Sequence, residues 1–477
     1  MLVVRTLEVD VAIIGGGTAG ITARKSALRH GARRVVVIEH GPLGTTCARV
    51  GCMPSKLLVT AAEAAHAVEA AKTFGVKAGP ASIDGPAVMR RVQSLRDVFV
   101  AGVTQDYESW PQEHRLTGTA RFVAPDTLEV DDHTRVKATS IVIAVGSHPF
   151  VPPVLRGLGD RLVTTDEIFE RDDLPGSIAV VGTGAVGLEL GQAMHRLGVR
   201  TTILSATRGL GPLRDPDLLE EAHRVFGAEL DLSFDVEIES ASRTDGGVEL
   251  VWKNGDGETQ RGEFELVLCA AGRRSNAAAL DLDAAELEVD DRGIPVHDSR
   301  TLQCADRPIF IAGDSTGDRA VLHEAADEGR HAGANAATWP EVRAYSRKTP
   351  LTIVFSDPQI AVVGKPGARD GEAACGEVDY RRQGRARVMG RSKGMVRVWG
   401  EVATGRLVGA EMLGPAVEHT AHLLAWAIQL DVTVGAALHL PYYHPVLEEG
   451  IRSAFSDLAA KLRLAPARSP LDCGPGD

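Results

Sequence analysis

The stretch "VDVAIIGGGTAGITARKSALRHGARRVVVIE", residues 9–39, decides the fold of the first part of this chain. An apolar run is followed by Gly15, Gly17 and Gly20, then by a segment with helical spacing, and then by a second apolar run that ends in Glu39. This order predicts a βαβ unit with a glycine-rich turn. The glycines permit the tight turn, the close approach of a pyrophosphate and the packing of helix on strand, while the helix N-terminus attracts phosphate. Glu39 can accept hydrogen bonds from ribose hydroxyls, so the unit predicts a bound dinucleotide.

A second unit of this kind lies in "SIAVVGTGAVGLELGQAMHRLGVRTTILS", residues 177–205. Its glycines keep the same spacing and are Gly182, Gly184 and Gly187. The second strand ends in Ser205 instead of an acid, and Arg208 follows three residues later. An acid at this point favours the free 2′-hydroxyl of NAD, whereas serine and arginine remove the repulsion of a 2′-phosphate. We therefore favour acceptance of NADP(H) over strict use of NAD, with a surface-loop role for Arg208 as the alternative.

Two dinucleotide units with different ribose chemistry predict two different dinucleotides. One can be a tightly held flavin and the other a nicotinamide that binds and leaves, whereas two sites of one kind would have no simple reaction to serve. The apolar strand "RPIFIAGDS", residues 307–315, ends at Gly313 and Asp314, so this carboxylate is expected in the ligand crevice of the sheet. Two similar strands end at Gly146 and Gly272 and are expected where the chain crosses between domains.

The fold class that these patterns predict is α/β, with two Rossmann-like dinucleotide-binding domains and a C-terminal α+β domain. A proline-rich linker is expected at residues 148–157, and alternating strands with an amphipathic helix are expected after about residue 347. The predicted boundaries are 1–150 and 276–346 for the first nucleotide-binding domain, 151–275 for the second, 347–465 for the C-terminal domain and 466–477 for a flexible tail with Cys473.

Composition and charge narrow the class of partner. The 477 residues include 64 acidic and 52 basic ones, and the formal charge of −12 argues against a nucleic-acid partner. No window approaches the roughly 18 apolar residues that a membrane span needs, and no secretory signal is recognisable, so we expect a cytoplasmic protein without a membrane partner. A run of arginines is interpreted as the solvated face of a strand-and-loop segment: Arg381, Arg382, Arg385, Arg387 and Arg391.

The stretch "GTTCARVGCMPSK", residues 44–56, holds Cys47 and Cys52 with four residues between them. The six cysteines of the chain are too scattered for a disulfide framework, so in a reducing compartment a close pair is either catalytic or metal-binding. Zinc would require further Cys or His ligands nearby, and none lies in this stretch, so no metal is expected. A bridge between residues five apart needs a distorted helical turn, for which Gly51 and Pro54 are the expected cause.

These motifs together resemble the pyridine nucleotide–disulfide oxidoreductases over essentially the whole chain, and within them the dihydrolipoyl dehydrogenases. The matching motifs follow the order of the family and are "GGGTAG", "GTTCARVGCMPSK", "GTGAVGLELG", "AGRRSN", "IFIAGD", "LHEAADEG" and "HPVLEE". The resemblance implies a glutathione reductase-like homodimer with FAD, NAD(P) and interface domains, in which the partner's C-terminal segment completes each active site. It also implies a flavin-dependent enzyme that couples a redox disulfide to NAD(P), with a lipoyl-bearing carrier protein or a small disulfide or dithiol as substrate.

The resemblance also implies a role for individual residues of the redox centre. Cys47 corresponds to the thiol that exchanges with substrate, and Cys52 to the thiol beside the flavin. Lys56 corresponds to the lysine near flavin N5, and Glu189 to its carboxylate partner. Such chemistry needs a thiolate, because the thiolate is the nucleophile.

A distant histidine and its acid are implied in proton transfer. His444 corresponds to the catalytic histidine and Glu449 to the acid that orients it, and a histidine can hold a thiol proton near neutral pH. Asp314 corresponds to the residue that binds the ribityl chain of the flavin. The remaining residues that we expect to contact a cofactor are Thr46, Gly146, Gly272 and Gly313.

Some positions depart from the family pattern, and other functions therefore stay open. Thr45, Tyr442 and Tyr443 indicate a divergent branch, and Ser205 leaves the preference between NAD and NADP undecided. A mercuric reductase or a thioredoxin-type relay would require two C-terminal redox residues, whereas only Cys473 is present, and a transhydrogenase can lack the redox pair altogether. A glutathione-type reductase shares the same centre and stays an alternative. A non-enzymatic flavoprotein subunit would be expected to have lost parts of this centre.

Overall fold

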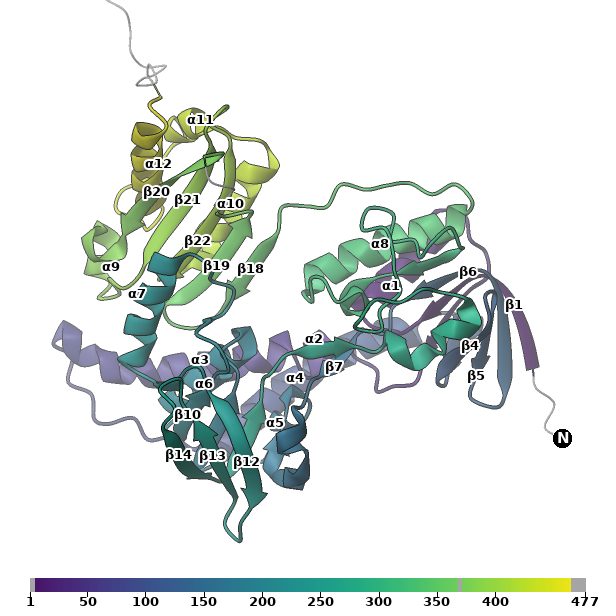
Figure 1. Ribbon diagram of the computed structural model, residues 1–477, viewed down its shortest axis with the longest axis horizontal. Coiled ribbons are helices and arrows are strands. Elements are labelled where there is room, and N and C mark those ends of the chain that lie inside the picture. The colour runs from purple at the N-terminus through teal and green to yellow at the C-terminus, as the bar shows by residue number, and fades with distance from the viewer. Residues whose placement is uncertain (1–4, 368–370, 465–477) are drawn as a thin grey trace, which may run out of the picture.

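The structure is a computed structural model that describes residues 5–367 and 371–464. Cys473 and the predicted tail, residues 466–477, lie outside the described residues. Figure 1 shows three units: the first lies at the right, the second lies below, and the C-terminal unit lies at the upper left. The mixed α/β class predicted from the sequence is confirmed, while the limits assigned to each domain stay a prediction.

The first nucleotide unit is built on a seven-stranded sheet in the order β3-β2-β1-β6-β5-β4, with β17 paired to β6. Strands β1 and β2 are parallel, as the βαβ pattern predicts, and Val11 pairs with Val35. The strands are β1 (Arg5–Ile14), β2 (Val35–Glu39), β3 (Arg115–Thr117), β4 (Ala120–Ala124), β5 (Thr127–Val130), β6 (Thr134–Ile143) and β17 (Ile309–Ile311). The helices are α1 (Thr18–Arg29), α2 (Thr46–Arg49), α3 (Cys52–Ala70), α4 (Gly85–Glu108) and α8 (Leu322–Thr338).

The second nucleotide unit has a five-stranded parallel sheet in the order β11-β10-β9-β15-β8 and a separate antiparallel sheet of β12, β13 and β14. The strands are β8 (Leu162–Val163), β9 (Ser177–Val181), β10 (Arg200–Leu204), β11 (Asp231–Ser233), β12 (Glu237–Arg243), β13 (Val248–Lys253), β14 (Thr259–Phe264) and β15 (Leu266–Cys269). The helices are α5 (Thr165–Ile168), α6 (Ala185–Arg196) and α7 (Pro216–Gly227).

The chain crosses between the two nucleotide units twice, and the two crossings pair with each other. Strand β7 (Ser147–Pro149) is antiparallel to β16 (Arg273–Ser275). The segment expected as a proline-rich linker therefore begins as a strand, and a 3-10 helix follows at Pro153–Arg161.

The C-terminal unit is an antiparallel sheet in the order β18-β19-β22-β21-β20, covered by helices, as its alternating pattern predicts. Its elements are β18 (Leu351–Val354), β19 (Gln359–Gly364), β20 (Ala373–Asp379), α9 (Gly384–Val388), β21 (Met395–Glu401), β22 (Leu407–Gly414), α10 (Val417–Gln429), α11 (Val434–Leu438) and α12 (Glu449–Lys461). The arginine run at 381–391 was predicted as strand and loop, which is wrong: it forms a 3-10 turn and α9, because Gln383 caps the helix by accepting from Ala386 N.

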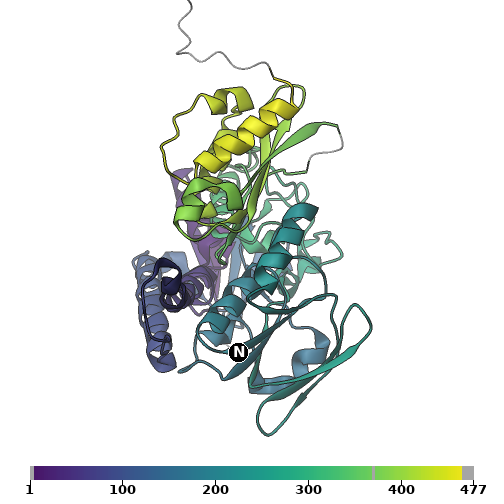
Figure 2. The same ribbon diagram turned by 90° about the vertical axis from the view of Figure 1, so that its left-hand side faces the viewer.

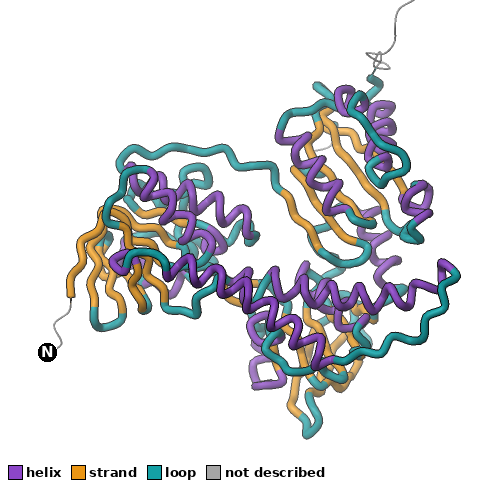
Figure 3. The backbone as a smooth tube through the Cα atoms, turned by 180° about the vertical axis from the view of Figure 1, so that it is seen from behind, coloured by secondary structure: helices purple, strands orange, loops and turns teal. Residues whose placement is uncertain are grey.

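Helices α3 and α4 bring the three units together. They extend from the first sheet to the space beneath the C-terminal unit, as Figure 3 shows from behind, and Figure 2 shows the C-terminal unit above the other two. Their buried side chains share one hydrophobic cluster with α6 and with the C-terminal sheet; Leu58, Met89, Leu188, Val354 and Leu413 belong to it. The N-terminus of α3, where Cys52 lies, is therefore anchored by contacts from all three units.

Candidate active site

The cysteine stretch is a helix interrupted by one glycine. Helix α2 ends at Arg49, and α3 begins at Cys52 after Gly51, whose φ of −125° and ψ of −118° are not helical. A Cβ at Gly51 would lie 3.0 Å from Thr46 O and 3.2 Å from Cys47 Cα, so a glycine allows the two turns to approach. Pro54 lies in the first turn of α3, and it has no N–H to donate to Val50 O as a helix continuous from α2 would require, so its position agrees with the expected break.

Cys47 and Cys52 are free thiols that hydrogen-bond to each other. The hydrogen bond with Cys47 lowers the pKa of Cys52 to about 7, against the opposing effect of burial, and the positive charge of Lys56 lowers it further. The same hydrogen bond raises the pKa of Cys47, and burial adds to this rise. A lowered pKa is what a thiol beside a flavin needs, and the assignment of Cys52 to that place stays a prediction.

Lys56 and Glu189 form an ion pair between the first and second nucleotide units. Lys56 Nζ lies 2.6 Å from Glu189 Oε2, and the same oxygen accepts a hydrogen bond of 2.9 Å from Ser55 Oγ. The other oxygen, Oε1, accepts from the backbone N–H of Phe355 at 2.9 Å. The Glu189 carboxylate is buried and fully paired, and it holds Lys56 one helical turn beyond Cys52.

His444 and Glu449 lie together in the C-terminal unit. His444 Nδ1 is 2.9 Å from Glu449 Oε1 and 3.0 Å from Oε2, and Val446 N donates to the carboxylate at 3.2 Å. The hydrogen bond with His444 lowers the pKa of Glu449, which favours an ionised acid that fixes the imidazole. The His444 side chain is 79% exposed, and within residues 5–367 and 371–464 no hydrogen bond or ion pair joins it to Cys47 or Cys52.

The first glycine-rich turn has room for a pyrophosphate. A Cβ at Gly20 would lie 1.8 Å from Gly15 O, so this position admits only glycine, whereas a Cβ at Gly17 would meet no atom within 4 Å. Glu39 holds the turn from the end of β2, since its carboxylate accepts from Gly16 N at 2.6 Å and from Gly41 N at 2.8 Å. Close helix–strand packing beside open space over the middle glycine fits a bound dinucleotide.

Asp314 lies where the two crossings meet. Ser147 Oγ donates to Asp314 Oδ2 at 2.8 Å, and Gly146 N donates to Ser315 Oγ at 2.9 Å. Gly313 N donates to the buried Glu328 carboxylate at 2.8 Å. The structure therefore brings Gly146, Gly313 and Asp314 together at one edge of the first sheet.

The second glycine-rich turn differs at its ribose position. Ser205 is buried, and its hydroxyl lies 2.7 Å from Thr183 Oγ1, which in turn donates to Gly209 O at 2.7 Å. No carboxylate occupies the place that Glu39 holds in the first unit. Arg208 is exposed, and its nearest acid is Asp235 at 3.6 Å.

The glycines of this turn repeat the arrangement of the first. A Cβ at Gly187 would lie 1.9 Å from Gly182 O, whereas a Cβ at Gly184 would meet no atom within 4 Å. Gly272, at the other crossing, accepts from Phe150 N through its carbonyl.

Three supporting residues were not expected from the sequence. Phe355 contacts both members of the Lys56–Glu189 pair. Thr183 is hydrogen-bonded to the Ser205 hydroxyl, and the Glu328 carboxylate accepts a hydrogen bond from Gly313 N. Phe355 lies 166 residues from Glu189 in the chain, and the other two contacts span 22 and 15 residues, so all three depend on how the chain folds back on itself. Among the described residues, no group of three or more His, Cys, Asp or Glu side chains is arranged to hold a metal ion. No helix in the same part of the chain is long and apolar enough to cross a membrane.

Comparison with protein families identifies the class. The family model described as "Pyridine nucleotide-disulphide oxidoreductase" matches residues 9–329, and the model of the family's dimerisation domain matches residues 351–455. This chain belongs to the pyridine nucleotide–disulphide oxidoreductases, as the motifs predicted. Members of this family depend on FAD and use NAD(P)H, so the cofactors of this protein are FAD and NAD or NADP.

Individual relatives are similar over nearly the whole length. A dihydrolipoyl dehydrogenase of Bacillus subtilis is 30% identical over 458 residues, which cover 93% of this chain and 97% of the relative. A mercuric reductase of Acidithiobacillus ferrooxidans is 31% identical over 469 residues, which cover 94% of this chain and 82% of the relative. The solved HOCl-induced flavoprotein disulfide reductase RclA from Escherichia coli has a TM-score of 0.80 at 21% identity and covers 94% of this chain and 99% of its own, which supports the fold alone.

Proposed function

We propose that this flavoprotein is a dithiol–disulfide oxidoreductase whose redox disulfide joins Cys47 and Cys52, and that its substrate is a dihydrolipoyl group. The observation that supports the proposal most directly is the polarised pair of sulfurs. The pKa of Cys52 is lowered to about 7 while that of Cys47 is raised, so the two thiols have different roles. Lys56 and Glu189 lie on the Cys52 side of the pair.

The cofactors would be held by the two glycine-rich turns. We assign FAD to Gly15, Gly17, Gly20, Glu39, Thr46, Gly146, Gly313 and Asp314, and NAD(P) to Gly182, Gly184, Gly187, Ser205, Arg208 and Gly272. Bound FAD would supply two-electron transfer between the Cys52 side of the pair and the nicotinamide. Because Ser205 is not an acid and Arg208 is exposed, nothing at this strand end repels a 2′-phosphate and a cation is available to it, so we propose that NADP(H) is accepted.

The protein's own residues handle the thiol chemistry. His444 accepts a proton from the substrate dithiol, and the resulting thiolate attacks the Cys47 sulfur, which breaks the Cys47–Cys52 bond and releases Cys52 as a thiolate. The second substrate thiol then displaces Cys47, so the substrate leaves as a disulfide and both cysteines are reduced. Two electrons and one proton pass on to NAD(P)⁺, and the second proton leaves to solvent. Disulfide reduction follows the same steps in reverse.

We propose a homodimer in which His444 of one subunit serves Cys47 of the other. The exposed His444 has its orienting acid, but in the part of the chain that the structure describes no hydrogen bond or ion pair joins it to Cys47 or Cys52. Apolar side chains are also exposed on α10 and at its C-cap in the same unit; Leu423, Trp426 and Leu430 are 45%, 64% and 74% exposed. A stripe of this kind is typical of a surface that another chain covers.

The lipoyl group is favoured over other disulfides because the pair and the His444–Glu449 dyad are combined with similarity to a dihydrolipoyl dehydrogenase. A mercuric or glutathione-type reductase stays the alternative. Tyr443, which is 80% exposed beside His444, is the departure best placed to meet a substrate, since Tyr442 donates its hydroxyl to Ala437 O. We place the protein in the cytoplasm, where a reactive thiol pair is maintained by reducing conditions.

The test is a steady-state panel with purified holoenzyme. Dihydrolipoamide, lipoamide, glutathione disulfide and Hg²⁺ are each assayed with both nicotinamides. We expect the highest kcat/KM with dihydrolipoamide or lipoamide. A preference for Hg²⁺ or glutathione disulfide would contradict the lipoyl assignment, and no turnover with any of the four would contradict the proposed activity.

A further inference from the structure

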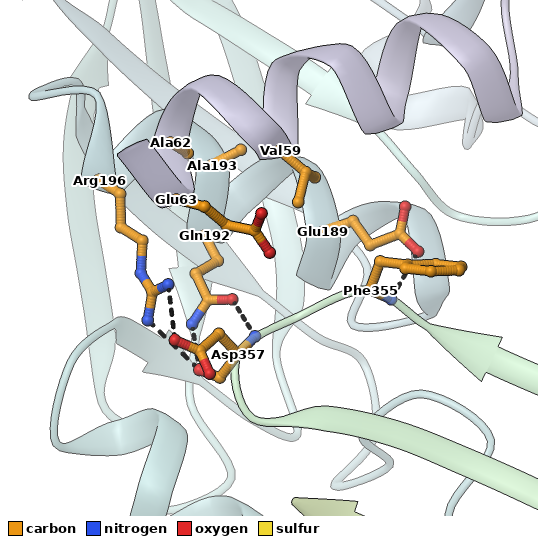
Figure 4. A pocket seen from close by; sticks show the side chains of 9 residues that line it. All are labelled: Val59, Ala62, Glu63, Glu189, Gln192, Ala193, Arg196, Phe355 and Asp357. Carbon is orange, nitrogen blue, oxygen red and sulfur yellow. Dashed lines mark hydrogen bonds and ion pairs between the residues drawn. The ribbon is translucent and has the colours of Figure 1, made fainter. Parts of the chain in front are cut away.

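A polar stripe on helix α6 of the second nucleotide unit contacts one short segment of the C-terminal unit. Glu189, Gln192 and Arg196 are spaced by three and four residues, so they lie on one face of the helix. All three bind the segment 355–357, which connects β18 to β19 (Figure 4). The stripe therefore begins at the acid that pairs with Lys56 and continues away from it.

The first member of the stripe is the Glu189 carboxylate, which binds the first unit through one oxygen and the C-terminal unit through the other. Oε2 binds Lys56 and Ser55 of the first unit, and Oε1 accepts from Phe355 N of the C-terminal unit at 2.9 Å. The Phe355 ring also lies 4.7 Å from Lys56 Nζ, which is a cation–π contact. Phe355 thus touches both members of the ion pair, once through its backbone and once through its ring.

The other two members hold this segment in place. The Gln192 amide donates to Asp357 O at 2.8 Å and accepts from Asp357 N at 2.7 Å, so its two ends bind one residue's backbone. Arg196 is 6% exposed, and its guanidinium lies 3.0 Å from Asp357 Oδ2 and 2.5 Å from Glu229 Oε1. Figure 4 shows both side chains converging on Asp357, with Phe355 and Glu189 beside them.

We infer that Gln192 and Arg196 are positioning residues that hold the Phe355 amide and ring around the Lys56–Glu189 pair, and thereby keep the Lys56 charge beside Cys52. The inference rests on the proposed function, in which Cys52 is the thiol on the flavin side. Neither residue touches a sulfur, and their effect is transmitted through Asp357 and Phe355.

The expected effect on Cys52 arises because the Lys56 side chain is free to move. The Lys56 side chain is 34% exposed, so it can turn to solvent if its partner moves. Without Gln192 or Arg196 the segment loses one of these two side-chain anchors, and the Phe355 N–H that donates to Glu189 Oε1 is held less firmly. Among the described residues, the charged or titratable groups that face Cys52 are Cys47, Lys56 and Glu189, of which Lys56 is the one cation. Displacement of Lys56 would therefore raise the pKa of Cys52.

The experiment titrates the long-wavelength charge-transfer absorbance of the two-electron-reduced holoenzyme against pH. We expect the midpoint to rise by about 0.5–1 pH unit in Arg196→Met and in Gln192→Leu. Arg196→Lys, which keeps a charge near Asp357, should recover part of the shift. Gln192→Leu decides the question if Arg196→Met does not fold.

The matched control is Arg397→Met. Arg397 also joins the C-terminal unit to the second nucleotide unit, through Asp215 at 2.7 Å and Asp217 at 2.6 Å, but it does not contact Glu189 or residues 355–357. Its midpoint should equal that of the wild type. An unchanged midpoint in Gln192→Leu, or an equal shift in Arg397→Met, would overturn the inference. A wild-type protein without the band would instead contradict the proposed function, so the two failures are distinguishable.

Discussion

The ammonium group of Lys56 lies 2.6 Å from Oε2 of Glu189, although the two residues come from different units and are 133 positions apart in the chain. The carboxylate is buried while the lysine is partly exposed. Its other contacts are neutral donors, so Lys56 is the one cation that contacts it among the described residues. The pair therefore affects two properties: the stability of the contact between the two nucleotide units and the ionisation of the neighbouring Cys52 thiol.

Removal of the lysine alone should cost more than removal of both charges. Lys56→Met leaves a buried, uncompensated carboxylate and should lower the free energy of unfolding by about 2 kcal/mol, since partial exposure of the lysine reduces the full effect. Lys56→Met with Glu189→Gln should recover part of this loss. Urea titration of the holoenzyme measures both values. A double variant less stable than Lys56→Met would show that the carboxylate is not destabilised by the loss of its cation.

The reduced protein should gain thiolate as the pH rises through about 7. The pKa of Cys52 is lowered to about 7, so the stability that this thiolate contributes is present above the ordinary thiol pKa and is lost as the pH falls through 7. The charge-transfer absorbance should follow the same curve, and Cys52→Ser should abolish it. Cys47→Ala removes the hydrogen bond that stabilises the thiolate and should move the midpoint to higher pH. If the midpoint is unchanged in Cys47→Ala, the low pKa of Cys52 has a cause other than the hydrogen bond with Cys47.

His444 should be needed for thiol exchange and not for cofactor binding. His444→Gln should lower dithiol turnover by about 100-fold or more, because a positioned acid–base group contributes 10²–10⁴-fold. FAD content and reduction by NAD(P)H should be unchanged. Glu449→Gln should have a smaller effect, since it removes only the acid that orients the ring. Unchanged turnover in His444→Gln would exclude this residue from the reaction.

Subunits with different defects should complement each other if the site is shared. Mixed after subunit exchange, Cys47→Ser and His444→Gln should form heterodimers with one intact site, which amounts to about a quarter of the wild-type sites for random pairing of equal amounts. Turnover of the mixture measures this value. Failure to recover activity, although exchange is demonstrated, would place both residues of one site in the same chain.

The nicotinamide preference should respond to charge at the end of β10. Ser205→Glu should raise the KM for NADP(H) about tenfold or more through repulsion of the 2′-phosphate, with a smaller effect on NAD(H). Asp235→Asn removes the acid nearest to Arg208 and should lower the KM for NADP(H). Steady-state kinetics with both nicotinamides give the comparison. A wild-type enzyme that does not use NADP(H) would contradict the role assigned to Ser205 and Arg208.

Alanine substitutions at two glycines of the second glycine-rich turn should affect different properties, stability in one case and nicotinamide binding in the other. Gly187→Ala places a Cβ 1.9 Å from Gly182 O, so it should lower the free energy of unfolding by about 2–3 kcal/mol. Gly184→Ala meets no protein atom within 4 Å, so it should cost less than about 1 kcal/mol and instead weaken nicotinamide binding. Urea unfolding and nicotinamide titration separate the two effects. Equal loss of stability in both variants would contradict the space seen over Gly184.

Much of the fold was predictable because it depends on local pattern. Glu39 and Ser205 were both expected at the ends of strands, and both lie there, since apolar runs bounded by glycine turns report strands directly. The arginine run at 381–391 was not predicted correctly, because its helix depends on a cap by Gln383, which lies against Val446 of a distant segment. Pro54 was expected to contribute to the distorted cysteine turn, and it lies directly after the break between α2 and α3, where it cannot donate to Val50 O.

The sequence by itself determined the two glycine-rich turns, the cysteine pair, and the type of chemistry that a thiol pair beside a dinucleotide site allows. Only the tertiary structure decided that Lys56 is paired with Glu189 and lowers the pKa of Cys52, because this depends on the packing of the first unit on the second. The tertiary structure also decided that the Ser205 hydroxyl is hydrogen-bonded to Thr183 and that Phe355 contacts both Lys56 and Glu189. Electrostatic effects act over a few ångströms in space, and Lys56, Glu189 and Phe355, which are more than a hundred positions apart, come within that distance only when the three units pack together.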